Sequence, residues 1–372
     1  MILPADPKAG YLKYKNEIDQ TVISVFEKGW YILGQEVMAF EHDFAQFVGA
    51  QYGVGVASGT DALLLALRAC GIGEGDAVVT VSHTAVATVA AIVLAGARPV
   101  LVDVDPETFV MDTAHLEETL LRNSALNIRG IVPVHLYGYP VDMRKVLELS
   151  SKYNLYVVED CAQAHGAIVA GKVTGAMGHL GAFSFYPTKN LGALGDGGAV
   201  VTSDPDLHER LLMLRQYGWK ERYVSDIAGY NSRLDEVQSA ILQVKLKHLG
   251  DDNNRRREIA EMYNQRLAST SLTLPVEKEG YHHVYHQYTI RTPQRNSLRE
   301  FLKSRGVGTS ILYPKPVHLQ SGYQDLCVVG PQGLGNTEMI CEEILSLPVY
   351  PELPNDVVSY ILDQITAWDK IA

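Results

Sequence analysis

The fold is decided by the stretch Phe183-Ser-Phe-Tyr-Pro-Thr-Lys-Asn-Leu-Gly-Ala-Leu-Gly-Asp-Gly-Gly198, in which a single lysine, Lys189, lies between a β-like run and a glycine-dense loop. Glycines at this density allow positive φ and a close approach of the backbone to another group. A lysine removed from water in such a loop loses proton affinity and becomes an amine nucleophile. Taken alone, the stretch is equally compatible with a tight loop whose lysine extends into solvent.

The chain before this stretch alternates short apolar segments with helical ones. We expect strands at 53–57, 78–81, 99–103, 131–135 and 155–159, with helices at 60–70, 84–95 and 142–153. Strands this uniformly apolar, alternating with helices, are typical of a parallel sheet covered on both faces. Ligands of such sheets bind beyond the carboxyl ends of the strands, so the loops that follow strands are the candidate site.

Further helices are predicted outside this region, at 13–28, 36–48, 205–217, 234–246 and 251–268. The composition changes near residue 270, where we expect strands at 284–290 and 307–313 and helices at 297–305 and 355–368. The sequence therefore predicts a large α/β domain over residues 1–250 and a small α+β domain over residues 251–372.

Three loops at the expected carboxyl edge of the sheet carry polar groups. Ser58-Gly-Thr-Asp61 begins a helix whose free N–H groups suit a phosphate, although an ordinary capped helix explains the same residues equally well. Asp160 follows a buried strand, where a carboxylate is costly unless a cation meets it, and Gln163 lies three residues further on. The alternative role of Asp160 is to cap the next short helix. The third loop carries Lys189.

A phosphate-binding helix start, a buried acid and a lysine in a glycine loop are together what pyridoxal 5′-phosphate (PLP) requires. The lysine holds the cofactor aldehyde as a Schiff base, and the carboxylate keeps the pyridinium nitrogen protonated. The helix terminus holds the phosphate. Because a parallel sheet brings all three loops to one edge, the agreement between fold and loops favours the catalytic interpretation of Lys189.

Composition argues against several other classes. A net charge of −11 is unsuited to general nucleic-acid binding. The absence of a run of eighteen apolar residues argues against a membrane span, and the N-terminus lacks the features of a signal peptide. The four cysteines show no CxxC spacing, so we expect a cytoplasmic protein without a zinc site.

Two further motifs are weak. The segment 166–173 has the glycine and lysine spacing of a P-loop, but Val173 replaces the hydroxyl that would hold magnesium, so we expect a β-turn between short strands. A nucleotide-binding redox domain is permitted by the alternation, yet no G-x-G-x-x-G follows the first strand. His282, His283 and His286 resemble a metal cluster only loosely because no carboxylate joins them, which favours a structural role.

The sequence resembles the DegT/StrS family of sugar-nucleotide aminotransferases, which has the aspartate aminotransferase (PLP fold type I) architecture. The resemblance runs through nearly the whole chain. It is carried by Gly29-Trp-Tyr-Ile-Leu-Gly34, Ala57-Ser-Gly-Thr-Asp-Ala-Leu63, Pro133-Val-His-Leu-Tyr-Gly138, Glu159-Asp-Cys-Ala-Gln-Ala-His165, the Lys189 stretch, Tyr230-Asn-Ser-Arg-Leu-Asp235 and Tyr313-Pro-Lys-Pro-Val-His318. Together these motifs are far more specific than any one of them.

The resemblance implies a role for each loop. Lys189 would be the Schiff-base lysine, Asp160 would pair with the ring nitrogen and Gln163 would contact the ring oxygen. The phosphate would be bound by Gly59, Thr60 and Ser184.

The resemblance also implies a homodimer with shared active sites, because Asn231 would reach the phosphate of the neighbouring subunit's cofactor. One position departs from the family pattern. Ala85 stands where relatives often place an aromatic side chain that stacks on the pyridine ring, and His83 is the nearest flat side chain that could take this role.

The reaction implied is amino transfer from L-glutamate, the usual donor of the family, to a nucleotide-linked keto-sugar. Relatives that act on C-4 keto-sugars often carry a glutamate where this chain has Asp196, and its Gly-Asp-Gly-Gly form looks more like enzymes that aminate C-3 of dTDP-3-keto-6-deoxyhexoses. We therefore predict a dTDP-3-amino-3,6-dideoxyhexose product. The alternatives are a C-4 aminotransferase, a non-catalytic regulatory protein of the same fold, or a sugar dehydratase, in which histidine would replace Lys189.

The diphosphate of such a substrate needs cationic or hydrogen-bonding partners despite the acidic chain. The candidates near Trp219 are Tyr217, Lys220 and Arg222, with Lys315 further along the chain. Tyr313 and His318 are candidates for contacts with the sugar. Each of these residues is equally compatible with a place on the surface or in packing.

Overall fold

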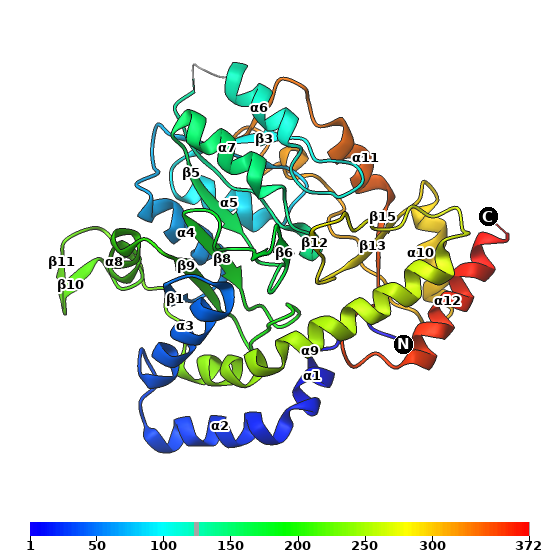
Figure 1. Cartoon of the computed structure of the whole chain (residues 1–372), viewed down its shortest axis with the longest axis horizontal. Helices are drawn as coiled ribbons and strands as arrows, with labels where there is room; N and C mark the ends of the chain where they lie inside the picture. Colours follow the sequence, from blue (N-terminus) through cyan, green and yellow to red (C-terminus); the bar gives the residue numbers. More distant parts are fainter. Residues whose placement is uncertain (123–125, 372) are drawn as a thin grey trace.

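An eight-stranded sheet forms the centre of the computed structural model, which describes residues 1–122 and 126–371 (Figure 1). The strands lie in the order β1 (Tyr52–Val56), β9 (Gly198–Thr202), β8 (Leu180–Ser184), β5 (Tyr156–Asp160), β4 (Ile128–Ile131), β2 (Ala77–Val81), β3 (Arg98–Val102) and β14 (Val328–Val329). β9 runs antiparallel to both of its neighbours, and the other adjacent pairs are parallel. The predicted mostly parallel α/β sheet is confirmed.

Helices cover both faces of the sheet, as the apolar strands require. One face packs against α4 (Gly59–Ala69), α5 (Val86–Leu94) and α8 (Pro205–Leu214), and the other against α6 (Thr113–Arg122) and α7 (Met143–Tyr153). Successive residues of β2 pack on opposite faces of the sheet. Val78 belongs to the apolar cluster that includes α4, α5 and α8, and Val79 belongs to the cluster that includes α6 and α7. All five residues of this strand are buried.

The N-terminal helices lie against one long helix. They are α1 (Pro7–Lys13), α2 (Lys15–Lys28) and α3 (Gln35–Val48), and the long helix is α9 (Glu236–Leu267), which crosses the molecule diagonally in Figure 1. Glu236 joins α9 to α3, because its carboxylate accepts hydrogen bonds from the N–H groups of Gly34 (2.7 Å) and Val37 (3.0 Å). Phe40 and Phe44 pack from α3 toward the sheet in the same cluster as Phe183 and Phe185.

The C-terminal unit has its own apolar core around the second half of α9. It contains the antiparallel pair β13 (Tyr288–Arg291) and β15 (Ile344–Leu347) with α10 (Arg295–Ser304) and α12 (Asn355–Asp369). The helix α11 (Gly335–Glu343) instead packs Ile340 in the core of the large sheet. Tyr263 from α9 is fully buried there with Tyr288 and Trp368. Both chain termini lie beside this unit in Figure 1.

The remaining elements are short. They are the sheet β12 (Tyr281–His282), β6 (Ile168–Val169) and β7 (Lys172–Val173), the hairpin β10 (Trp219–Glu221) and β11 (Val224–Ser225), and the 3₁₀ turns η1 (Leu136–Gly138) and η2 (Val317–Leu319). The β6–β7 hairpin confirms the turn expected within 166–173. Within the described ranges, no helix is both long and apolar enough to cross a membrane.

Three predictions of elements are wrong. The strand expected at 131–135 lies at Ile128–Ile131, so the two share only Ile131. The helices expected at 234–246 and 251–268 are one continuous helix, α9, so the predicted domain boundary at residue 250 falls inside it. The strand expected at 307–313 is reduced to single bridges, Val307 with Ile2 and Ser310 with Ser346. The N-terminal segment lies against this stretch, where a Cβ added to Gly308 would come within 2.8 Å of the Ile2 carbonyl oxygen.

Candidate active site

Three strand ends bring the predicted site together. β5 ends at Asp160, β8 ends at Ser184 and leads to Lys189, and β1 leads through Ser58 into α4. β5 and β8 are parallel neighbours, with Asp160 opposite Ala182. The parallel order of these strands therefore places the acid, the lysine loop and the helix start at one edge of the sheet, as expected.

Lys189 lies in a loop that is held on several sides. Its N–H donates to the Tyr186 carbonyl oxygen (2.8 Å), and the Lys245 ammonium of α9 donates to the Gly192 carbonyl oxygen (2.6 Å). Lys189 keeps some accessible surface, but burial lowers its pKa from 10.5 to about 8, with Asp160 acting in the opposite direction. The lysine therefore releases its proton far more readily than an exposed lysine does.

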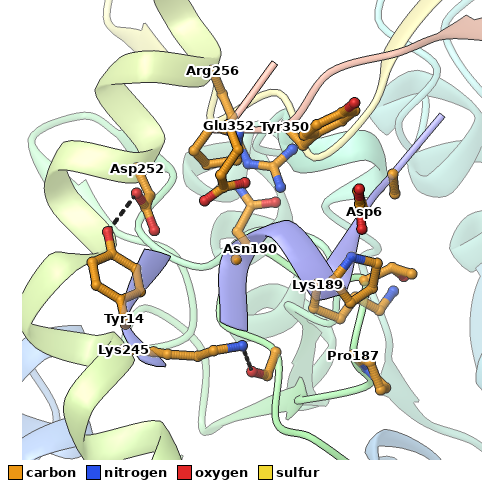
Figure 2. A pocket seen from close by; sticks show the side chains of 16 residues that line it. Asp6, Tyr14, Pro187, Lys189, Asn190, Lys245, Asp252, Arg256, Tyr350 and Glu352 are labelled. Carbon is orange, nitrogen blue, oxygen red and sulfur yellow. Dashed lines mark hydrogen bonds between the residues drawn. The ribbon is translucent and has the colours of Figure 1, made fainter. Parts of the chain in front are cut away.

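The loop also borders a pocket on the side of α9 and the C-terminal unit (Figure 2). Arg256 points into this pocket from α9, with Glu352 and Tyr350 beside it and Asp6 of the N-terminal segment opposite. Arg256 donates to the Val349 carbonyl oxygen (2.7 Å). The long helix thus fastens the lysine loop through Lys245 and the C-terminal segment through Arg256.

Asp160 is almost completely buried and accepts two hydrogen bonds. Thr88 Oγ1 donates to Oδ2 (2.8 Å), and the N–H of Ala162 donates to Oδ1 (3.1 Å). Burial nevertheless raises the pKa of Asp160 above 3.8, against Thr88, Ala162 and Lys189, which act to lower it. A buried carboxylate of this kind is suited to meet a cationic partner.

The amide of Gln163 is oriented by its neighbours. The N–H of Tyr137 donates to Oε1 (2.7 Å), and Nε2 donates to the Tyr313 hydroxyl (3.1 Å). Because the amide oxygen is already engaged, Gln163 presents its N–H₂ group to the site, which suits an anionic ring oxygen. Tyr313 also faces Asp160, and burial raises the Tyr313 pKa to about 12, so its phenol stays protonated at neutral pH.

The start of α4 lies directly against the end of β8. A Cβ added to Gly59 would lie 2.5 Å from the Ser184 Cβ, so only glycine permits this approach. Ser58 caps the helix by accepting from the N–H of Asp61 (3.1 Å), whereas the N–H groups of Gly59 and Thr60 have no intrahelical acceptor. The structure therefore brings Gly59, Thr60 and Ser184 together around a helix start.

These residues fit PLP as a set. A lysine of lowered pKa, a buried carboxylate, an amide that offers N–H and a glycine-lined helix start match the aldehyde, ring nitrogen, ring oxygen and phosphate in turn. No other ligand considered from the sequence requires all four of these protein groups together.

Three side chains next to Lys189, of which His165 and His286 are buried, were not predicted to belong to the site. Asn190 donates to the Asn253 side chain (2.8 Å) and to the Val284 carbonyl oxygen (3.0 Å), and its Oδ1 lies 3.1 Å from His286 Nδ1. His165 is fully buried, and within the described chain neither of its ring nitrogens has a partner. Burial first, then Lys189, lowers the His165 pKa to about 3, so a neutral ring faces the lysine.

His83 is not placed to stack on a cofactor ring. It is completely buried, with Nε2 3.0 Å from the Tyr137 hydroxyl and Nδ1 3.5 Å from Cys341 Sγ. The structure therefore leaves His83 without an open face, and we withdraw it from the ligand-contact residues. Ala85, two residues on, keeps some accessible surface.

The predicted substrate residues divide into two groups. Tyr313 lies in the site, where its hydroxyl accepts from Gln163. His318 follows five residues later in the sequence, with Nδ1 2.8 Å from Ser82 Oγ and Nε2 3.2 Å from Glu338 Oε1. Lys315 is exposed between them. Both sugar candidates therefore belong to the segment that closes over the end of β2.

The second group lies in and beside the β10–β11 hairpin. Lys220 and Arg222 belong to the β10–β11 hairpin, which projects at the edge of the molecule beside α8 in Figure 1. Lys220 pairs with Glu209 (3.8 Å), and Arg222 lies over the Tyr223 ring. Tyr217 precedes the hairpin in the left-handed region, and Asn231 follows it on the surface.

A buried His135–Glu159–Cys161 cluster is the one potential metal-ligand group among the described residues. Its lone pairs are already used. Glu159 accepts from the N–H groups of Gly175 (2.9 Å) and Gly178 (2.7 Å) and from His135 (3.1 Å), while His135 Nδ1 accepts from the N–H of Val141 (3.0 Å). This cluster is a hydrogen-bond network, and the histidines at 282–286 do not converge as ligands in the described chain.

Comparison with known proteins matches this geometry. The sequence profile described as the DegT/DnrJ/EryC1/StrS aminotransferase family matches residues 13–366. The chain is 42% identical over 365 residues to a dTDP-3-amino-3,4,6-trideoxy-alpha-D-glucose transaminase of Streptomyces venezuelae, covering 98% of this chain and 95% of the relative. It is 43% identical over 357 residues to a dTDP-3-amino-3,6-dideoxy-alpha-D-galactopyranose transaminase of Aneurinibacillus thermoaerophilus, covering 96% of each. It is also 41% identical over 358 residues to a pleiotropic regulatory protein of Geobacillus stearothermophilus, covering 95% of each.

Solved structures are similar over the same length. A DegT DnrJ EryC1 StrS aminotransferase from Brucella abortus is 34% identical with a TM-score of 0.96, covering 99% of this chain and 100% of that one. The NtdA protein of Bacillus subtilis, solved with bound cofactor PMP, is 28% identical with a TM-score of 0.88, covering 96% of this chain and 82% of that one.

Proposed function

The chain belongs to the DegT/DnrJ/EryC1/StrS family of PLP-dependent sugar aminotransferases, and we propose that it transfers the amino group of L-glutamate to C-3 of a dTDP-3-keto-6-deoxyhexose. The observation that carries the proposal is the pair formed by Lys189, with its pKa of about 8, and the buried Asp160 at one edge of the sheet. The two transaminase relatives, whose names specify a dTDP-3-amino sugar, support the position and the nucleotide.

Each predicted residue has a task in this reaction. PLP, when bound, supplies the electron sink that stabilises negative charge at the donor α-carbon. Lys189 would hold the cofactor aldehyde, and its amine, when free, would move the proton of the donor α-carbon. A pKa near 8 leaves part of the lysine population neutral at physiological pH, as a general base requires.

The other side chains hold the cofactor in register. Asp160 faces the ring nitrogen, and Gln163 donates to the ring oxygen. Three groups at the helix start hold the phosphate, namely Gly59, Thr60 and Ser184. Tyr313 and His318 face the sugar from the segment over β2.

The hairpin residues act on the partner subunit's site. Lys220 and Arg222 lie on the hairpin that projects at the edge of the molecule, with Tyr217 before it and the exposed Asn231 after it, and we assign all four to the neighbouring site of a homodimer. Large apolar side chains exposed at the start of α3 supply an interface, with Trp30 65% and Met38 67% exposed. The free cysteines, three of them buried, suit a reducing cytosol, which is the compartment that we propose.

A regulatory protein without catalysis is the second candidate, because the Geobacillus stearothermophilus relative carries that name. The retained Lys189 and Asp160 argue for catalysis. An absorbance band near ~420 nm, bleached by L-glutamate, distinguishes an active aminotransferase from an inert binder, since the band arises from the lysine-bound cofactor.

The decisive test is a panel of 3-keto and 4-keto nucleotide sugars, each offered with dTDP and UDP as the nucleotide. We expect amination of the dTDP-3-keto-6-deoxyhexoses at a rate that Lys189→Ala abolishes. Because Asp196 supports the C-3 assignment, the 3-keto sugar should be preferred. Preference for a 4-keto sugar contradicts the position, and turnover by Lys189→Ala contradicts the mechanism.

A further inference from the structure

Two threonine hydroxyls lead to the carboxylate of Asp160. Thr88 Oγ1 donates to Asp160 Oδ2 over 2.8 Å, and Thr84 Oγ1 lies 2.8 Å from Thr88 Oγ1. All three side chains are buried, with exposed fractions of 2% for Thr84, 1% for Thr88 and 4% for Asp160. Thr88 is described above only as a donor to Asp160, and Thr84 lies one hydrogen bond further from the site.

The hydrogen bonds that join Thr84, Thr88 and Asp160 are all donated in the same direction. An ionised carboxylate only accepts hydrogen bonds, so the Thr88 proton must point at Asp160. The Thr88 oxygen is then free to accept, and Thr84 supplies the proton. The order Thr84 to Thr88 to Asp160 therefore favours the ionised carboxylate over the neutral acid.

Among the neighbours of Asp160, Thr88 is the one that best stabilises the ionised carboxylate. Thr88 lies in the first turn of α5, whose positive end favours negative charge. The titratable groups that face Asp160 from other elements are Lys189 after β8, His135 after β4 and Tyr313 before η2. Burial raises the pKa of Asp160, and among the groups that oppose this effect the Thr88 hydrogen bond is the largest.

We propose that Thr88 is a positioning residue for amino transfer, which keeps Asp160 ionised and aimed at the ring nitrogen of PLP, and that Thr84 orients Thr88. The inference rests on the proposed function, because the ring nitrogen is the partner that requires the charge. It adds to the site two side chains that touch neither cofactor nor substrate.

The test compares four variants of the holoenzyme. Thr88→Val removes the hydroxyl at nearly constant volume, Thr88→Ser keeps it, and Thr84→Val removes the second donor. Thr80→Val is the matched control, because Thr80 is also completely buried but donates to the Val132 carbonyl oxygen. The readouts are the dissociation constant for PLP, from the lysine-bound absorbance band, and the pH dependence of kcat.

We expect Thr88→Val to weaken PLP binding by about tenfold and to move the acid limb of kcat upward by about one pH unit, because a carboxylate that loses a donor is protonated more easily. Thr88→Ser restores both values, Thr84→Val shifts both in the same direction by less, and Thr80→Val shifts neither. A limb that moves downward has the wrong sign.

Three results overturn the inference alone. They are a Thr88→Val enzyme that matches Thr80→Val in both readouts, a Thr88→Ser enzyme as impaired as Thr88→Val, and a Thr84→Val enzyme that matches the wild type. If Thr88→Val does not fold, the serine and Thr84 variants decide. A wild-type protein without the absorbance band overturns the proposed function instead, and this inference with it.

Discussion

The burial of Lys189 lowers the stability of the folded chain but prepares the amine for catalysis. Burial lowers its pKa from 10.5 to about 8, so the folded chain holds the proton less tightly than the unfolded chain does. The contribution of Lys189 to the free energy of unfolding should therefore be most unfavourable below pH 8, where the lysine is charged in both states. It should become less unfavourable from pH 8 to 10.5, where only the unfolded state stays protonated.

We predict that Lys189→Met stabilises the cofactor-free protein at pH 7, by at most about 3 kcal/mol, and that this advantage shrinks between pH 8 and 10.5. Urea denaturation across that pH range measures it. Lys172→Met, at an exposed lysine, is the matched control and should show no such trend. An advantage that is independent of pH contradicts the prediction.

Some residues of the candidate site could be predicted from the sequence, and others could not. Lys189, Asp160 and Gln163 were predictable because each follows a strand within a recognisable motif. Thr88 was not, because its contact with Asp160 depends on where the fold places the first turn of α5 relative to the end of β5 rather than on spacing. His83 was assigned wrongly for the same reason, since adjacency in sequence does not reveal that its ring faces Tyr137 and the core.

At the scale of elements, Gly250 explains the one misread helix. A glycine in a polar stretch between two apolar patterns usually marks a helix end. Here Gly250 keeps helical backbone, and α9 continues because its first half packs on α2 and α3 while its second half packs in the C-terminal core. Tertiary packing overrides a local propensity of about 1 kcal/mol.

We predict that Gly250→Ala raises the free energy of unfolding by about 0.5–1 kcal/mol, since nothing lies within 4 Å of the added Cβ and alanine favours a helix. Gly29→Ala is the matched control. It has equal space, but Gly29 ends α2 with a φ of 67°, so alanine should destabilise by about 1–2 kcal/mol. Chemical denaturation measures both, and changes of the same sign contradict the assignment of α9 as one helix.

At the scale of the whole molecule, the residues of the proposed site come from two separate parts of the chain. The lysine loop follows β8, whereas the β10–β11 hairpin projects at the edge of the molecule and is followed by the exposed Asn231. The sequence motifs assign these residues to one proposed site, and only the fold shows that they come from separate elements. The parallel sheet was predictable from apolar strands, whereas the antiparallel β9 was not, because both orientations bury the same residues.

We predict that Lys189→Ala and Asn231→Ala proteins, each inactive or strongly impaired alone, regain activity when they are unfolded and refolded together. A mixed dimer contains one site with a normal lysine and a normal Asn231 from the other chain, whereas action within one chain would leave no complete site. Lys189→Ala refolded with the Lys189→Ala/Asn231→Ala double variant gives the baseline. A mixture that stays at this baseline contradicts the shared site.

The place of β9 has a consequence for synthesis. β1 lies at the edge of the sheet, and its neighbour there is β9, with Tyr52 opposite Thr202. The helix start that Ser58 caps is therefore supported only after the segment carrying Lys189 has been translated. Because translation begins at the N-terminus, β1 and α4 leave the ribosome before β9 has been made. The pairing of β1 with β9 must therefore wait until the later strand appears. The phosphate-binding half of the site is thus made early and completed late.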